Sequence, residues 1–191
     1  MSIHPLDEEG RVIPDASWPP GREAPGRLEH VRRFLNTTNR ESGADHLAEP
    51  GRAGRWLAAE GWTISVQWSE VAELCRFRTQ LHAVIAAGFE EPRRVWPAAF
   101  TDAALALESE DGTLHLVGAG HGAERVVNDL VAIVVHADAD GTLGRLAVCA
   151  NDHCGWSFYD RSKNRTGQWC SMTACGQRQK MRRYRSRHRA R

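Results

Sequence analysis

The sequence contains no long hydrophobic run and no recognisable export signal. Its longest aliphatic stretch, residues 130–135, is six residues long, far short of the roughly 20 that an α-helix needs to span a bilayer. Residues 1–25 carry acids and prolines where a secretory signal would have a basic start and an apolar centre. We therefore expect no membrane partner and a cytoplasmic location.

Motifs of the common catalytic sites are also missing. There is no G-x-S-x-G or H-E-x-x-H sequence, and no lone cysteine stands at a recognisable spacing from a histidine. The glycines of residues 118–123 lack the spacing and the lysine of a phosphate-binding loop, which favours a flexible connector. We expect that the protein is not an enzyme.

Acidic residues are scarce at one end of the chain. Residues 145–191 contain twelve Lys or Arg and two acids, a net charge of +10, whereas residues 1–144 contain thirteen bases and 22 acids, a net charge of −9. The overall charge of +1 hides this asymmetry. A strongly basic segment on an acidic body indicates a polyanionic partner, most often a nucleic acid.

Length and composition fit a globular body with a small second module. The 191 residues are 41% hydrophobic, enough for a real core. We divide this α+β chain into an extended, proline-rich arm (1–26), a mainly helical body with a β-hairpin (27–142) and a C-terminal module (143–191). Apolar spacing in the body predicts helices over residues 28–41, 54–60, 69–88 and 123–136, and another helix from about residue 97. Ser69 is the expected N-cap of the helix over residues 69–88. Residues 105–108 and 113–117 are predicted to form a hairpin around the turn Asp111–Gly112.

Four of the five cysteines form two close pairs. Four residues separate Cys149 from Cys154 and Cys170 from Cys175, and the two pairs are fifteen residues apart. This arrangement is typical of a structural zinc site, in which each pair presents two thiolates to one tetrahedral ion. We predict one structural zinc per chain with no open position for catalysis. A pair of disulfides or an iron–sulfur cluster is the alternative.

The segment between the cysteine pairs predicts a small aromatic core. Trp156, Phe158 and Trp169 alternate as the apolar face of a hairpin whose polar turn is residues 161–167. About 47 residues bury little area, so zinc and these aromatics must supply most of the stability of the module. His153 is predicted to be a surface residue. Cys75, in an apolar helical pattern of the body, is predicted to be a small core residue.

A basic helix is predicted after the second cysteine pair, because the residues that follow Cys175 are mostly helix-compatible. At 100° per residue its cations spread over two neighbouring faces: Arg178, Arg182 and Arg185 on one, and Lys180, Arg183 and Arg187 on the other. Such a wide basic surface fits a duplex groove or a row of phosphates. The alternative is a basic tail that is disordered beyond about residue 185 and has no specific target.

Residues 149–187 resemble the CGNR zinc finger, which we expect to be treble-clef-like. The matching residues are Phe158, Asp160, Ser162, Asn164, Arg165, Trp169, Cys170, Ser171, Met172, Cys175, Gly176, Arg178, Lys180, Arg182, Arg183 and Tyr184. The chain departs from the family at Gln177, where the family has Asn, and at residues 167–168, where Arg is frequent. Gln177 keeps a side-chain amide at this position.

The body is similar to the ABATE domain, which precedes this finger in bacterial stress-induced transcription regulators. The resemblance rests on Phe34, Asn36, Thr37, Arg40, Asp45, Leu47, Trp56 and Leu57, and on the spacing from the hairpin to the finger. Together the two resemblances cover about residues 27–187. They imply a DNA-binding regulator with a sensing or assembly domain.

Our leading hypothesis is a transcription regulator that binds DNA with its zinc module. The residues expected to contact nucleic acid are Arg165, Gln177, Arg178, Lys180, Arg182, Arg183 and Arg185. RNA binding is one alternative, and a thiol redox switch that releases zinc on oxidation is another. In the body, Asn36, Thr37 and Arg40 either line a ligand pocket or satisfy local backbone groups. A homodimer would place two zinc modules on two half-sites.

Overall fold

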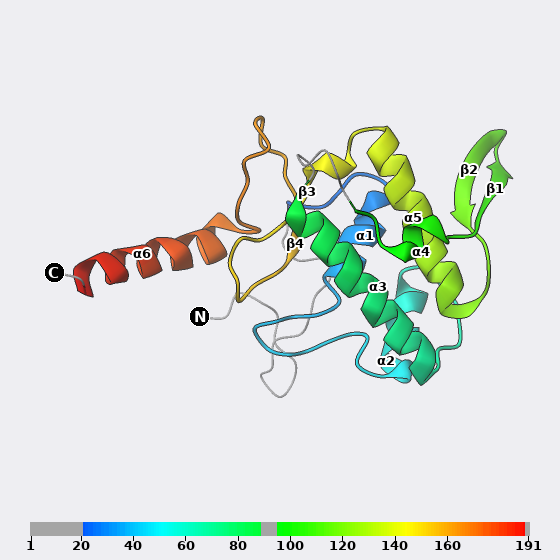
Figure 1. The fold of residues 1–191 in the computed structure, drawn as a ribbon, viewed down its shortest axis with the longest axis horizontal. Coiled ribbons are helices and arrows are strands. Elements are labelled where there is room, and N and C mark those ends of the chain that lie inside the picture. The colour runs from blue at the N-terminus through cyan, green and yellow to red at the C-terminus, as the bar shows by residue number, and fades with distance from the viewer. Residues whose placement is uncertain (1–20, 89–94, 190–191) are drawn as a thin grey trace.

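The computed structural model describes residues 21–88 and 95–189, so most of the expected N-terminal arm lies outside the described residues. The body is built on three central helices, α1 (Leu28–Leu35), α3 (Trp68–Ala87) and α5 (Gly122–Ala139). Two further helices, α2 (Pro50–Ala59) and the short α4 (Ala98–Thr101), pack around them (Figure 1). The apolar faces of these helices share one core, which includes Phe34, Leu81 and Leu130.

The predicted body helices are all present, with shifted ends. The first ends at Leu35 instead of continuing to residue 41, because Asn36 is its C-cap and Thr37 bonds back to the carbonyl of Phe34. The N-cap of α3 is Gln67, not Ser69. The Gln67 side chain bonds the N3 backbone N–H, and the Glu70 carboxylate accepts the Gln67 N–H at 2.8 Å, which forms a capping box.

The predicted body hairpin is confirmed. Strands β1 (Leu105–Glu110) and β2 (Thr113–Gly118) pair antiparallel, and the turn places Asp111 at φ 49° and Gly112 at φ 75°. Only β2 lies closely along α5. Gly118 makes this approach possible, because a Cβ there would lie 2.3 Å from the backbone nitrogen of Asp129.

The C-terminal module contains the 3-10 turn η1 (Leu143–Arg145), strands β3 (Leu146–Val148) and β4 (Ser157–Tyr159), the π-helical turn η2 (Met172–Gly176) and helix α6 (Gln177–Arg189). The hairpin prediction for this module was wrong in its pairing. Strand β4 pairs with β3, which precedes the first cysteine pair, and not with the segment near Trp169. The hairpin therefore encloses the loop of the first pair, and residues 161–169 run as an irregular loop.

The module shares apolar contacts with the body. Leu143, Leu146 and Tyr159 belong to the body core, whereas Trp156 and Phe158 pack with the four cysteines in a second, smaller cluster. Helix α6 projects from this end of the molecule, opposite the β1–β2 hairpin (Figure 1). The mixed α+β class with a C-terminal four-cysteine module is thus confirmed. None of the helices in the described ranges has the length and apolar character needed to cross a membrane.

Candidate metal centre and basic helix

The four predicted zinc ligands converge on one point. The Sγ atoms of Cys149, Cys154, Cys170 and Cys175 all lie within 4.8 Å of one another, with separations of 3.6 Å for Cys154–Cys170 and 3.7 Å for Cys170–Cys175. A tetrahedron with Zn–S bonds of about 2.3 Å has edges of about 3.8 Å. The sulfurs therefore already have the spacing of a four-thiolate zinc site, and all five cysteines are free of disulfides.

Protonation of the four thiols is strongly coupled. Hydrogen bonds from Cys154 and Cys170 lower the pKa of Cys149 to about 7, and the pKa of Cys175 is also lowered by its sulfur neighbours. The same contacts raise the pKa of Cys154 and of Cys170. Four buried sulfurs so close together cannot all ionise without a cation between them, and a soft divalent ion supplies that charge. The donor set fits one structural zinc per chain with no coordination position left open.

Helix α6 begins two residues after Cys175 and is densely cationic. Seven of its thirteen residues are Arg or Lys, and residues 161–191 contain no acid. Among the predicted contact residues, Gln177, Arg178, Lys180, Arg182 and Arg185 are exposed. Beyond its packing on η2, α6 is tied to the body by an ion pair of Arg178 with Glu41 at 3.1 Å. A cationic helix held at one end on a metal-binding base indicates nucleic-acid recognition.

Residues 145–188 match the model of the CGNR zinc finger. The matched range begins in η1, includes all four cysteines and ends one residue before the last residue of α6. No curated protein matches the chain. The match supports a metal-binding zinc finger with a nucleic-acid-binding role for this end of the molecule.

Asn151 and Ser171 hold the two cysteine turns of the CGNR finger in shape. The buried Asn151 side chain donates from Nδ2 to the Sγ of Cys175 at 3.5 Å, and its backbone carbonyl accepts the N–H of Cys154. Ser171 Oγ accepts the N–H of Ala174 and caps η2. Our sequence analysis did not assign either role. The signal was available, because Asn and Ser favour such local side-chain bonds in tight turns.

The finger is joined to the body by a side chain that imitates a strand. Asn36 Nδ2 donates to the carbonyl of Ser157 at 2.9 Å, and the N–H of Ser157 donates to Asn36 Oδ1 at 2.7 Å. Both residues are almost fully buried. The Asn36 side chain thus hydrogen-bonds both backbone groups of Ser157, on the edge of β4 that does not pair with β3. These bonds connect positions that are 121 residues apart in the chain.

Two further body residues meet the loop of the first cysteine pair. The half-buried His82 of α3 donates from Nε2 to the carbonyl of Gly155 at 2.8 Å. Burial lowers the pKa of His82, although the carbonyl acts in the opposite direction. Gly155 has φ 68°, in the left-handed region that favours glycine, and a Cβ there would lie 2.6 Å from Nε of the exposed Arg40 side chain, which would have to move.

The buried carboxylate of Asp160 organises the loop that contains Arg165. It accepts the N–H groups of Ser162 at 2.9 Å and Gly167 at 2.8 Å. Burial alone would raise the pKa of Asp160, but these hydrogen bonds outweigh it and hold the pKa below its usual range. Arg165 itself is exposed, in the left-handed region at φ 53°, and its Nη1 lies beside Gly144 of η1. It therefore lies on the loop and not on the basic helix.

The three residues considered for a ligand pocket are separated by the fold. Asn36 holds β4, and Thr37 is buried, donating to Phe34 and accepting from Arg78 Nη1 at 2.7 Å. Arg40 is exposed and lines a cavity of about 210 Å³ beside Gly155. The structure thus gives two of the three residues internal partners, and their role as a ligand-binding set stays a prediction.

The other sequence predictions for the finger concern burial. Trp156 is buried and Trp169 packs partly buried against the same cluster, which places both in the finger core. His153 is exposed, as predicted. The four cysteines of the metal site are only 2–8% exposed. The redox switch stays a prediction, for which zinc release during a peroxide titration is the direct measurement.

Proposed function

We propose that this protein is a DNA-binding transcription regulator whose helix α6 enters the major groove. The observation that carries the proposal is the projection of a solvent-exposed, acid-free cationic helix from a rigid four-cysteine base (Figure 1). Thirteen helical residues extend about 20 Å, and the major groove of B-DNA is wide enough to admit one α-helix.

The charges of α6 suit two kinds of contact. Lys180, Arg182 and Arg185 are exposed along the helix and would bind phosphates, which position the helix without reading sequence. Gln177 and Arg178 lie in the first turn of α6, directly after the metal-binding turn η2. Arg and Gln are the side chains that pair with guanine and adenine edges, so these two residues are the candidates for base readout.

Salt dependence of binding tests the phosphate contacts. Binding of the zinc-loaded protein to a 20-base-pair duplex is followed by fluorescence anisotropy from about 50 to 200 mM salt, and about four phosphate contacts give a log–log slope near −4. The double change Arg182→Ala and Arg185→Ala should flatten the slope by about two. The matched control, Arg52→Ala with Arg55→Ala, removes the same charge from the exposed side of α2. An unchanged slope in the α6 variant contradicts the assignment.

Selection from fragmented genomic DNA tests the regulatory role. The zinc-loaded protein is incubated with the fragments and excess RNA at about physiological salt, and retained DNA is sequenced. Discrete peaks that share a motif support a regulator. Loss of all retention to the RNA competitor supports the RNA-binding alternative, since RNA-binding proteins recognise single-stranded or A-form substrates.

The proposal gives the body a sensing or assembly role in the cytoplasm and assigns it no catalysis. Dimerisation would place two copies of α6 in successive major grooves, about 34 Å apart. Light scattering of the purified protein with and without a two-site duplex measures this state. A 1:1 complex on every selected site contradicts the dimer.

A further inference from the structure

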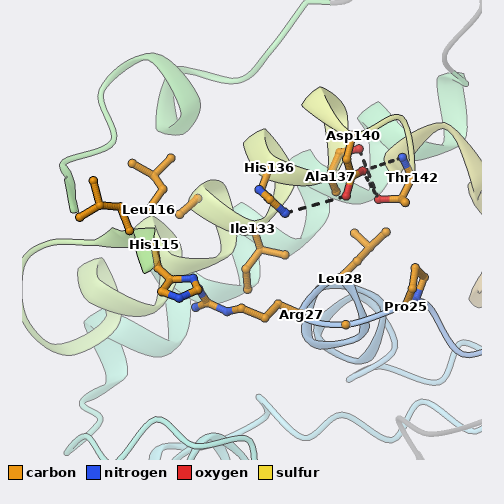
Figure 2. Close-up of a pocket in the computed structure, with 13 residues that line it drawn as sticks. Pro25, Arg27, Leu28, His115, Leu116, Ile133, His136, Ala137, Asp140 and Thr142 are labelled. Atoms are coloured by element: carbon orange, nitrogen blue, oxygen red, sulfur yellow. Dashed lines mark hydrogen bonds and ion pairs between the residues drawn. The ribbon is translucent and has the colours of Figure 1, made fainter. Parts of the chain in front are cut away.

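A cavity of about 390 Å³ lies on the body, between the start of α1, strand β2 and the C-terminal half of α5 (Figure 2). Its volume is within the range of small-molecule sites. None of its lining residues belongs to the zinc centre or to α6. The cavity therefore forms a site separate from the zinc centre and α6.

The floor of the cavity is apolar. Leu28 of α1, Leu116 of β2 and Ile133 of α5 line it from three different elements. Two small side chains of α5, Ala132 and Ala137, leave the space between these larger ones open. The same surface continues onto Leu114 at the mouth, which is 67% exposed. An apolar molecule in this space would remove from water mainly the surface of Leu114 and of the half-buried Leu116, since Leu28 and Ile133 are already buried.

The two ends of the cavity differ in charge. Figure 2 shows the Arg27 side chain extended from the start of α1, with its guanidinium directed toward His115 of β2. Neither residue has an acidic partner within the described ranges. At the opposite end the Asp140 carboxylate is occupied, because it accepts the N–H of Thr142 at 2.8 Å and its hydroxyl, and faces His136 at 3.9 Å. One end therefore offers hydrogen-bond donors that have no acidic partner in residues 21–88 and 95–189, and the other carries negative charge.

We propose that this cavity binds a small amphipathic monocarboxylate, such as an aromatic or medium-chain acid. The carboxylate pairs with the Arg27 guanidinium, with His115 as a second donor, because guanidinium and carboxylate match as a two-bond pair. The apolar part lies on Leu28, Leu116 and Ile133. The charge of Asp140 at the far end fixes this orientation and disfavours a dicarboxylate.

Isothermal titration calorimetry of the full zinc-loaded chain tests the proposal with 1-naphthoate, hexanoate and phenylacetate. The best of the three should bind with a dissociation constant on the order of 1 mM or tighter. 1-Naphthalenemethanol, which keeps the rings of naphthoate and lacks the charge, should bind at least about tenfold more weakly than naphthoate. Arg27→Gln should cost a similar factor, whereas Arg55→Gln, at an exposed arginine of α2, should change nothing.

Location is tested by NMR and by filling the cavity. Backbone amide signals of Leu116, Ile133 and His136 should shift with naphthoate, and Leu116→Trp should abolish the shifts while the other signals of the folded protein remain. The proposal is overturned if naphthoate and 1-naphthalenemethanol bind equally well, or if Arg27→Gln leaves the binding of naphthoate unchanged. It is also overturned if none of the three acids binds at a concentration of about 10 mM. Naphthoate shifts confined to the outer edge of the β1–β2 hairpin overturn it as well.

Discussion

The bridge between Asn36 and Ser157 gives the sharpest test of how the finger is held. Replacing Asn36 by Ala removes two hydrogen bonds and leaves the N–H and the carbonyl of Ser157 without these partners, at a residue that is 0% exposed. A buried backbone group that loses its partner costs about 1–3 kcal/mol. We therefore expect Asn36→Ala to lower the free energy of unfolding by about 2–5 kcal/mol.

Ser157→Ala is the matched control for this change. The Ser157 hydroxyl is buried with no hydrogen-bond partner among the described residues, whereas its backbone groups carry both bonds to Asn36. Its removal should leave the free energy of unfolding within about 1 kcal/mol of the wild type or raise it, since it relieves a buried unpaired polar atom. Comparison of Ser157→Ala with Asn36→Ala thus distinguishes the loss of the two hydrogen bonds from a general effect of substitution at this contact.

The assay is urea unfolding at fixed free zinc, with hydrogen exchange of the Ser157 amide as the local probe. For a domain of this size the expected cost of Asn36→Ala corresponds to a fall in Tm of about 5–15 °C. The Ser157 amide should exchange faster than in the wild type, and the central amides of α5 should be affected less. A cost below about 1 kcal/mol for Asn36→Ala, or equal costs for the two variants, refutes the reasoning.

Three further predictions follow from the site. Chelation of zinc, or Cys170→Ser, should abolish the near-ultraviolet circular dichroism of the finger tryptophans and keep most of the body helicity; retained finger signals would contradict a structural metal. Because burial lowers the pKa of His82, the unfolded state binds more protons than the folded state near pH 6, and the free energy of unfolding should fall as pH drops below about 6.5. In a pH series of unfolding measurements, His82→Gln should lose less stability at low pH than the wild type. Parallel curves for the two proteins would exclude His82 as the source of this loss. Glu41→Gln frees Arg178 and should tighten duplex binding about two- to fivefold, a gain that the exposed control Glu49→Gln should not reproduce in the same anisotropy assay.

Short-range patterns in the sequence predicted most of the elements. The long apolar period of α3 and the Asp111–Gly112 turn are local signals, and both features are present. The two cysteine pairs predicted the metal centre residue by residue, because tetrahedral coordination leaves few alternatives for four thiolates. The pairing of β4 was predicted wrongly. A three-residue strand carries too little pattern to choose between two neighbouring partners, and the true partner β3 lies before the metal loop.

The contacts between body and finger could not be predicted, since they join positions far apart in the chain. Glu41 and Arg178 are 137 residues apart, and His82 meets Gly155 across 73 residues. The alternation of apolar residues in a strand and their period in a helix describe only residues close in sequence, so they do not predict contacts between residues far apart in the chain. Polar residues at the end of α1 were recognisable as unusual, but their partners were not.

These contacts also explain why a finger with so small a core has a defined place on the body. Its own cluster contains the cysteines, Trp156 and Phe158, whereas the next strand residue, Tyr159, turns into the body core. The two faces of β4 are thus stabilised by different means, one by the metal site and one by the body helices. Asn36 closes the remaining edge of that strand. The direction of α6 is therefore set jointly by the metal-binding turn η2 and by the body, which reaches the finger at β4 through Asn36 and reaches α6 directly through the Glu41–Arg178 ion pair.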